Sequence, residues 1–333
     1  MDISREYIRF KHTICKKLVL AKKKAPQIVR EIQKNPPEPV NFAYEKNISY
    51  SQLSMYTQCP KKWALQYRDG HKIREQSIHM TFGTALHETL QMYLDVMYNQ
   101  SAVKADELDL ETDFETRLRD CYAEAYKQNK GEHFTDAQTL REFYSDGVEI
   151  INYLRRNRRK YFSKRGWWLV GCEIPIVLAP NPHLPRVKYM GFLDVVMYNE
   201  TTNKFIIIDI KTSTRGWNDK AKKDKSKQHQ LVLYKKFFAE QYNVPIDDID
   251  IEFFIVKRKL YESQDFVIKR IQQFRPPSGK TSVNQATKSL NEFLDNCFTS
   301  EGYNEKDMPA LTNNNCKWCP YFKTHLCNAT FEK

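Results

Sequence analysis

The stretch Phe205-Ile-Ile-Ile-Asp209-Ile-Lys211, with Gly191-Phe-Leu-Asp194 upstream of it, decides both the fold and the chemistry that we predict. Both stretches are apolar and β-branched, as buried strands are, and the turn-like segment 199–204 separates them. Two strands joined by a short loop form a hairpin, which can bring Asp194 beside Asp209. Three isoleucines precede Asp209 and indicate that it ends a buried strand, where a carboxylate is costly unless it is paired or binds a metal.

Two carboxylates and one ammonium would converge on one point of this hairpin. Close carboxylates repel each other unless a cation lies between them, and hard oxygen ligands suit Mg²⁺ or Mn²⁺. Lys211 follows Asp209 by two residues, so both lie on one strand face, where the ammonium can orient a metal-activated water. The pattern predicts a metal-dependent phosphodiesterase. A solvated strand edge would explain the Asp-x-Lys tripeptide alone, but not its buried surroundings.

Four stretches of the chain form an ordered set of motifs. They are Gly83-Thr-Ala-Leu-His87, Gly191-Phe-Leu-Asp194, Asp209-Ile-Lys211 and Gln230-Leu-Val-Leu-Tyr234. In this order they resemble the PD-(D/E)XK nuclease superfamily and, within it, the RecB-type branch; the first and last match its Gly-x-x-x-His and Gln-x-x-x-Tyr helix motifs. The resemblance implies an α/β fold: a mixed central β-sheet flanked by helices (a restriction-endonuclease-like core), an N-terminal helical subdomain and a C-terminal cysteine cluster.

The resemblance also implies a metal site. Asp194 and Asp209 would supply oxygen ligands to Mg²⁺ or Mn²⁺, and the backbone carbonyl of Ile210 would supply a third. His87 would complete the coordination or contact the attacking water. Without the resemblance, His87 would be read as a core histidine with its hydrogen bonds satisfied.

The remaining matched residues are expected to support catalysis. Lys211 would position the water and stabilise the charge that develops on the phosphate. Gln230 and Tyr234 are four residues apart and share one helix face, so they would hold the substrate phosphate or support Lys211. Glu173, on a strand predicted over 167–178, is a candidate outer-shell or second-metal ligand.

Cysteines supply a second signal. Cys59 lies far upstream of Cys316, Cys319 and Cys327, and this one-plus-three arrangement resembles AddB-like and CRISPR-associated nucleases that hold a [4Fe–4S] cluster. Seven residues separate Cys319 from Cys327, a wider gap than in that family. The three C-terminal cysteines with His325 could instead form a structural zinc site. The others are expected to be ordinary thiols: Cys15, Cys121, Cys172 and Cys297.

Composition favours a polyanionic partner. The 333 residues carry a formal net charge of +12 and a pI of about 9.1, with basic clusters at 16–24, 155–160 and 220–227. The sequence contains neither an apolar run of membrane-spanning length nor a signal-peptide core. We therefore expect no membrane partner and a cytoplasmic location in a bacterial, archaeal or phage-infected cell.

The chain is expected to divide into a basic N-terminal arm (1–47), a helical subdomain carrying Cys59 and His87 (48–165), the nuclease core (166–300) and an iron–sulfur segment (301–333). The arm should be a short helix followed by an extended linker, and Ser51 is the predicted N-cap of the next helix. Further strands are predicted over 186–198, 204–212, 250–257 and 264–273, and helices over 228–242 and 283–298.

The function most consistent with these features is a metal-dependent DNA exonuclease that hydrolyses DNA ends or single strands in recombination, repair or replication. The chain lacks a phosphate-binding Gly-x-x-x-x-Gly-Lys motif, so any helicase or recombination partner would be a separate protein. Two alternatives stay open at this point. One is a non-catalytic DNA-binding iron–sulfur module of a helicase–nuclease complex, and the other is a nuclease of CRISPR spacer acquisition.

Overall fold

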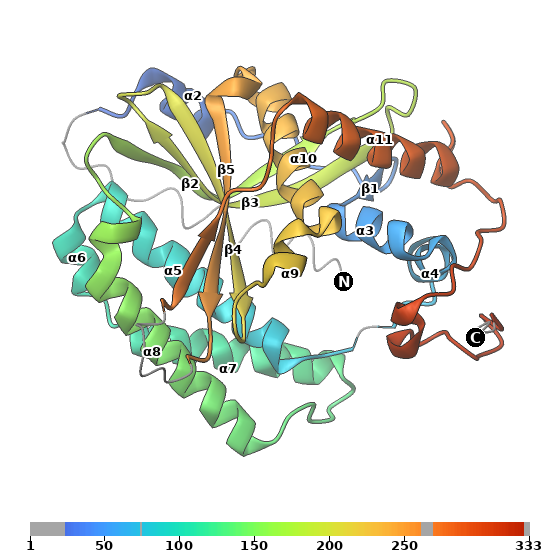
Figure 1. The fold of residues 1–333 in the computed structure, drawn as a ribbon, viewed down its shortest axis with the longest axis horizontal. Helices are drawn as coiled ribbons and strands as arrows, with labels where there is room; N and C mark the ends of the chain where they lie inside the picture. The colour runs from blue at the N-terminus through green and yellow to red at the C-terminus, as the bar shows by residue number, and fades with distance from the viewer. Residues whose placement is uncertain (1–23, 74, 261–268, 330–333) are drawn as a thin grey trace.

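A mixed β-sheet with helices on both faces forms the centre of the computed structural model, which describes residues 24–73, 75–260 and 269–329 (Figure 1). This architecture confirms the predicted fold class. Cys15, most of the first basic cluster and the first half of the strand predicted over 264–273 lie outside the described residues. None of the helices in the described ranges is long and apolar enough to cross a membrane.

The hairpin predicted from the sequence is the middle of the sheet. Its two strands, β3 and β4, pair antiparallel, and β4 pairs parallel with β5. A crossover that contains a long helix connects β4 to β5. The sheet order is β1-β3-β4-β5-β6, and β2 lies antiparallel along β3. The strands are β1 (Lys46–Ile48), β2 (Trp167–Leu178), β3 (Val187–Asn199), β4 (Lys204–Ser213), β5 (Ile249–Lys257) and β6 (Ile271–Phe274).

Two apolar cores hold the helices against the sheet. One lies between the sheet and α10, α11, α2 and α3, and the other between the sheet and α5 to α8 (Figure 1). The helices are α2 (Gln27–Lys34), α3 (Tyr50–Gln58), α4 (Pro60–Trp63), α5 (Ile78–Asn99), α6 (Ala102–Asp106), α7 (Leu110–Gln128), α8 (Ala137–Tyr161), α9 (Asp219–Lys223), α10 (Lys225–Tyr242) and α11 (Lys280–Cys297). Short helical turns are η1 (Ala64–Arg68), η2 (Ile246–Asp248) and η3 (Asn314–Trp318).

Strand β4 shows why its sequence is so apolar. Ile207 packs on the α10 side of the sheet, while Ile206, Ile208 and Ile210 pack on the α5 side, so both faces are buried. The expectation that Asp209 ends this strand is wrong. The parallel ladder to β5 continues to Ser213, and Asp209 therefore lies within a central strand.

The segment before the helical region differs from the sequence expectation in two details. Lys46–Ile48 forms strand β1, which pairs with the start of β3. The short helix expected in this arm is α2, which buries Val29 and Ile32 in the core on the α10 side. Ser51 is not an N-cap, since α3 begins at Tyr50 and its N-cap residue is Ser49. Strand β1 was missed because three residues that pair at a sheet edge carry too short a pattern to recognise.

Gly147 lies in α8 at the contact with α7, and its replacement is expected to destabilise the protein. A Cβ atom there would lie 2.2 Å from Cε1 of Phe114, a fully buried side chain. Although alanine is the better helix former by about 1 kcal/mol, Gly147→Ala should lower the free energy of unfolding by roughly 1–3 kcal/mol through overpacking. Urea unfolding followed by circular dichroism measures this change.

Gly279→Ala is the matched control, because an added Cβ there meets no atom within 4 Å. Equal urea midpoints for Gly147→Ala and the unmodified protein would show that α7 and α8 pack less tightly than the structure indicates.

Candidate active site

The two strands of the β3–β4 hairpin separate where the predicted acids lie. Their ladder extends from Asn199 and Lys204 to Val195 and Ile208. Beyond that pair, the backbone N–H of Ile210 donates a 2.7 Å hydrogen bond to Oδ2 of Asp194, a side-chain oxygen, instead of to a strand carbonyl. The structure thus brings Asp194 next to Asp209, as the hairpin pattern predicted.

Asp209 and Lys211 form an ion pair in which the acid is buried and the lysine is partly exposed. Nζ of Lys211 lies 3.1 Å from Oδ1 and 2.9 Å from Oδ2 of Asp209, whose side chain is 4% exposed. Burial alone would lower the pKa of Lys211, but the charges of Asp209 and Asp194 outweigh burial and raise it above its ordinary value. Lys211 is therefore held as an ammonium ion.

His87, on α5, approaches the same carboxylates from the opposite face of the sheet. Its Nδ1 lies 3.7 Å from Oδ2 of Asp194. Burial lowers the pKa of His87 to about 4, so the ring is neutral at pH 7 and can act as a ligand. Burial, followed by the charge of Asp209, raises the pKa of Asp194 well above its usual range. A divalent cation between the two acids would relieve this repulsion.

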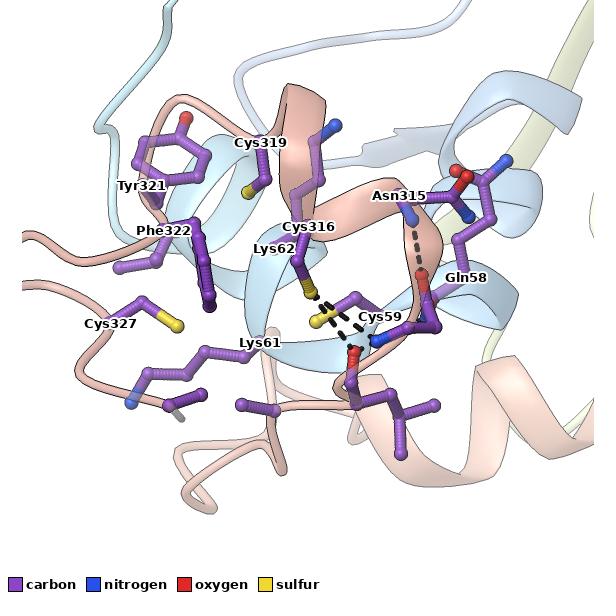
Figure 2. Close-up of a pocket in the computed structure, with 15 residues that line it drawn as sticks. Gln58, Cys59, Lys61, Lys62, Asn315, Cys316, Cys319, Tyr321, Phe322 and Cys327 are labelled. Atoms are coloured by element: carbon purple, nitrogen blue, oxygen red, sulfur yellow. Dashed lines mark hydrogen bonds between the residues drawn. The ribbon is translucent and has the colours of Figure 1, made fainter. Parts of the chain in front are cut away.

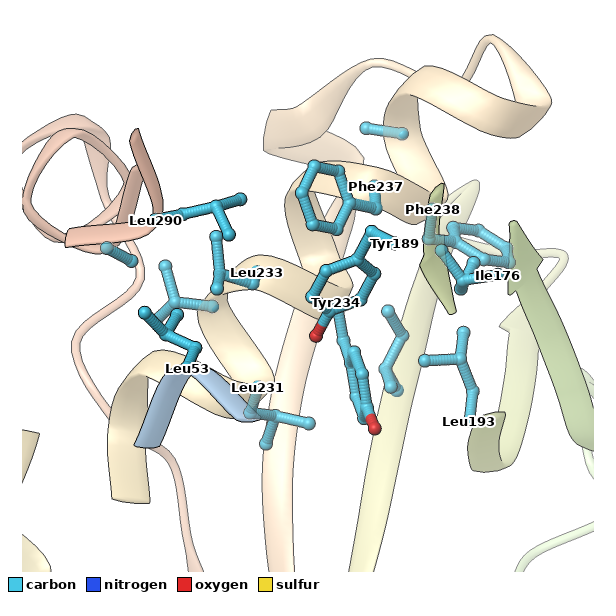
Figure 3. Packing of buried hydrophobic residues seen from close by; sticks show 14 of the residues in the cluster. Leu53, Ile176, Tyr189, Leu193, Leu231, Leu233, Tyr234, Phe237, Phe238 and Leu290 are labelled. Carbon is cyan, nitrogen blue, oxygen red and sulfur yellow. The ribbon is translucent and has the colours of Figure 1, made fainter. Parts of the chain in front are cut away.

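Gln230 and Tyr234 lie on α10, above the β4 face that carries Lys211. Oε1 of Gln230 accepts a 3.2 Å hydrogen bond from Nζ of Lys211, and its Nε2 donates to the hydroxyl of Tyr234 at 3.4 Å. Burial raises the pKa of Tyr234 to about 12, so its hydroxyl stays neutral. Tyr234 packs with the apolar side chains that α10 places on the sheet (Figure 3). This geometry favours the supporting role for the pair, with Gln230 fixing the position of the Lys211 ammonium.

The glycines of the first two motifs permit close approach. A Cβ on Gly191 would lie 2.8 Å from Cε1 of Tyr234, and a Cβ on Gly83 would lie 3.3 Å from Oγ1 of Thr212. Gly191 therefore makes room for the tyrosine ring against β3, while Gly83 lets α5 approach the end of β4. Both glycines therefore allow a helix to pack closely against a strand that carries one of the acids.

Glu173 joins the site from β2. Its neighbours Cys172 and Ile174 pair with Val195 and Leu193, so Glu173 lies opposite Asp194. Its backbone has a φ of +53°, which is rare for a residue other than glycine. Nε2 of Gln91 donates to Oε1 of Glu173 at 2.9 Å.

Sequence reasoning missed Gln91 altogether. One signal was available: Gln91 follows His87 by four residues, so it lies one turn further along the same face of α5.

The oxygen atoms present suit a hard cation. Within the described part of the chain, Oδ2 of Asp209 is buried and accepts no hydrogen bond. It lies 2.9 Å from Nζ of Lys211, an ion-pair distance, but the angles there are not those of a hydrogen bond. A buried carboxylate oxygen of this kind is a ready metal ligand. Nevertheless, across residues 24–73, 75–260 and 269–329, no three His, Cys, Asp or Glu side chains lie close enough together to hold a metal ion as they stand.

The four cysteines predicted to act together line one pocket beside α4 (Figure 2). Cys59 lies between α3 and α4, Cys316 lies in η3, and Cys319 and Cys327 follow. The side chain of Asn313 joins the two parts of this pocket, because its Nδ2 donates to the carbonyl of Gln58 at 3.0 Å. His325, the fourth member of the alternative zinc site, does not line the pocket.

Comparison with known proteins identifies the family. The PD-(D/E)XK nuclease superfamily matches residues 47–327, whereas no curated protein matches the chain. Among solved structures, the chain is similar to the crystal structure of a "putative exonuclease" from Eubacterium rectale, with 11% identity, a TM-score of 0.43, and coverage of 83% of this chain and 84% of that one. Because the family match spans most of the sequence, including the acids, Lys211 and the four clustered cysteines, this chain belongs to the PD-(D/E)XK nuclease superfamily.

Proposed function

We propose that this nuclease is a metal-dependent DNA exonuclease of the RecB type, which hydrolyses phosphodiester bonds at DNA ends or in single strands. The observation that carries the proposal is the pair of acids at the point where β3 and β4 separate, with Lys211 hydrogen-bonded to Asp209. Buried carboxylates beside a fixed ammonium form a site that can bind a cation and a water molecule together.

The donor atoms fit Mg²⁺ or Mn²⁺ better than a softer metal. The carboxylates of Asp194 and Asp209, the carbonyl of Ile210 and the neutral ring of His87 would hold the ion. When bound, the metal would lower the pKa of a water molecule and offset charge on the phosphate. Lys211 would then orient that water.

DNA is the expected substrate because of charge. The exposed side chains of Lys220, Lys223 and Lys225 lie in and next to α9, between the end of β4 and the helix that carries Gln230. Such lysines can contact phosphates without reading the base sequence. The protein would act in the cytoplasm in recombination, repair or replication, with a separate helicase or recombination protein.

A [4Fe–4S] cluster is the proposed occupant of the cysteine pocket, as in AddB-like nucleases. Four thiolates satisfy such a cluster, and Cys59, Cys316, Cys319 and Cys327 all line the pocket. A structural zinc ion is the competing occupant. The cluster would join the segment around Cys59 to the C-terminal segment, on which Tyr321 is also buried.

A cleavage assay tests the proposed function. The purified protein is incubated with Mn²⁺ and linear strands labelled at either the 5′ or the 3′ end, with single-stranded circles as the end-free substrate. We expect short labelled products from linear DNA, intact circles, and no products with a chelator. Tight DNA binding without cleavage in Mn²⁺ or Mg²⁺ would instead identify a non-catalytic DNA-binding module.

Neutralising the exposed lysines in and next to α9 should weaken DNA binding in a salt-dependent way. The triple variant Lys220→Ala, Lys223→Ala and Lys225→Ala should bind a single strand less tightly. It should also reduce the slope of log affinity against log salt by about 2, since each phosphate contact on single strands contributes roughly 0.7. Fluorescence anisotropy with a labelled strand, over a range of salt concentrations, measures both quantities.

The control replaces three exposed lysines on other helices, Lys34, Lys127 and Lys288. An equal slope change in both triple variants would mean that net charge, and not the region beside α9, governs DNA binding.

A further inference from the structure

The sheet has a local irregularity at Glu173 and Asp194, which lie opposite each other in β2 and β3. Residues two apart in a strand normally point to the same face. Here the two residues that flank each acid pack in opposite cores. The alternation of side chains between the two sheet faces therefore shifts by one residue in both strands, at Glu173 and at Asp194. Ile174 and Leu193 pack on the α10 side, and Cys172 and Val195 on the α5 side.

Glu173 carries backbone strain at this irregularity. Its φ of +53° lies in the left-handed region, which is unfavourable for a residue with a side chain because Cβ crowds the following carbonyl oxygen. Strain of this kind persists only where surrounding contacts hold it in place, and it is concentrated at functional sites. The left-handed backbone of Glu173 accompanies this shift in β2, on the side from which α5 approaches.

Gln91 bridges the two acids at this point. Its side-chain amide Nε2 donates to Oε1 of Glu173 at 2.9 Å and to the main-chain carbonyl of Asp194 at 3.1 Å. The residue is only 6% exposed. Because His87 lies one turn earlier on α5 and contacts the Asp194 carboxylate, this helix contacts both the side chain and the backbone of Asp194.

The hydrogen bond from Gln91 to Glu173 lies in a region where negative charges repel one another. The charge of Glu173 contributes to the raised pKa of Asp194, after burial and the charge of Asp209. Three carboxylates therefore lie close together, and their mutual repulsion favours moving Glu173 away from Asp194. The hydrogen bond that Gln91 donates to Glu173 opposes this movement.

We propose that Gln91 is a positioning residue of the metal site: by holding the Glu173 carboxylate and the Asp194 backbone together, it sets the affinity of the site for a divalent cation. This inference rests on the proposed function and deepens it. Groups that orient metal ligands from outside the coordination shell typically change metal affinity 10- to 100-fold when removed. Gln91 makes no contact with the metal in this scheme and acts only through its two partners.

Calorimetric titration of the 333-residue protein with MnCl₂, without DNA, tests the role. Gln91→Leu removes both donated hydrogen bonds and puts an apolar side chain of similar size in place of the amide. We expect it to weaken Mn²⁺ binding roughly 10- to 100-fold. If Gln91→Leu does not yield folded protein, Gln91→Met, which has an unbranched side chain of the same length, replaces it.

Gln241 provides a matched control. It is also a glutamine that reaches from a helix to β2, where it bonds the carbonyl of Pro175 and the N–H of Val177. Gln241→Leu should leave Mn²⁺ affinity unchanged, although it also loses two side-chain hydrogen bonds to β2, one donated and one accepted. A shift as large as that of Gln91→Leu would mean that general destabilisation explains both.

A double-mutant cycle separates positioning from simple packing. If Gln91 acts through Glu173, adding Gln91→Leu to Glu173→Ala should weaken Mn²⁺ binding much less than Gln91→Leu does alone. Wild-type affinity in folded Gln91→Leu, or fully additive effects, would overturn the positioning role while the proposed nuclease function stands. A wild-type protein that binds no Mn²⁺ and cleaves no DNA would overturn the proposed function, and this inference with it.

Discussion

Lys211→Ala should lower the rate of DNA hydrolysis by roughly a hundred- to a thousandfold, as removal of one preorganised donor to a developing charge does in other enzymes. The ammonium of Lys211 is fixed between Asp209 and Gln230, so the variant removes a donor that is already positioned. DNA affinity should change little, because one phosphate contact contributes only a small part of the binding. Single-turnover cleavage and fluorescence anisotropy measure the two effects separately.

The variant also leaves Asp209 without its partner in a buried position, so thermal unfolding should be measured beside activity. Lys236→Ala is the control, since Lys236 lies on α10 but pairs with Glu240. It should cleave DNA at the wild-type rate. Cleavage by folded Lys211→Ala within a factor of a few of wild type would remove Lys211 from the mechanism.

Cys316→Ser should abolish the proposed iron–sulfur cluster. Sγ of Cys316 lies at the pocket that also contains Cys59, and it accepts a hydrogen bond from the N–H of Asn313 at 3.4 Å. Loss of one of four thiolates leaves the cluster incompletely ligated. The anaerobically purified variant should therefore be colourless and free of iron, whereas the unmodified protein should be brown with about four iron atoms per chain.

Metal binding contributes to folding stability when the apo chain cannot form the site, so the melting temperature of Cys316→Ser should fall as well. Cys121→Ser is the control, because Cys121 lies on α7, outside the pocket. It should keep the colour and the iron. A colourless wild-type protein containing one zinc ion would favour the structural zinc site.

The β3–β4 hairpin was predicted from local sequence pattern alone. Residues 186–198 and 204–212 were predicted as paired strands, and β3 and β4 confirm this within one residue at each end. The strand predicted over 167–178 matches β2, and the helix predicted over 228–242 ends as α10 does, although α10 begins earlier, at Lys225. Apolar periodicity determined these elements because their faces are buried, and burial is what periodicity records.

Other features depend on contacts that no local pattern contains. The pattern predicted a strand over 204–212 but placed Asp209 at the end of its buried part, because the ladder that puts Asp209 inside the strand is formed with Phe253 of β5, which is distant in the sequence. It did not predict the hydrogen bonds from Gln91, since a glutamine in an amphipathic helix is usually solvated. The strained backbone of Glu173 was also invisible, because glutamate carries no preference for a left-handed conformation.

The sequence by itself determined the fold class, the hairpin and the set of chemical groups: two acids, a lysine, a histidine and four separated cysteines. Only the tertiary structure decided which of these groups meet, at what distances, and how deeply they are buried. The physical reason is that residue type and periodicity act over a few residues, whereas the separation of β3 from β4 and the approach of α5 result from packing the whole sheet. The pKa of Asp194, raised by burial and by charges from other strands, is set by that packing.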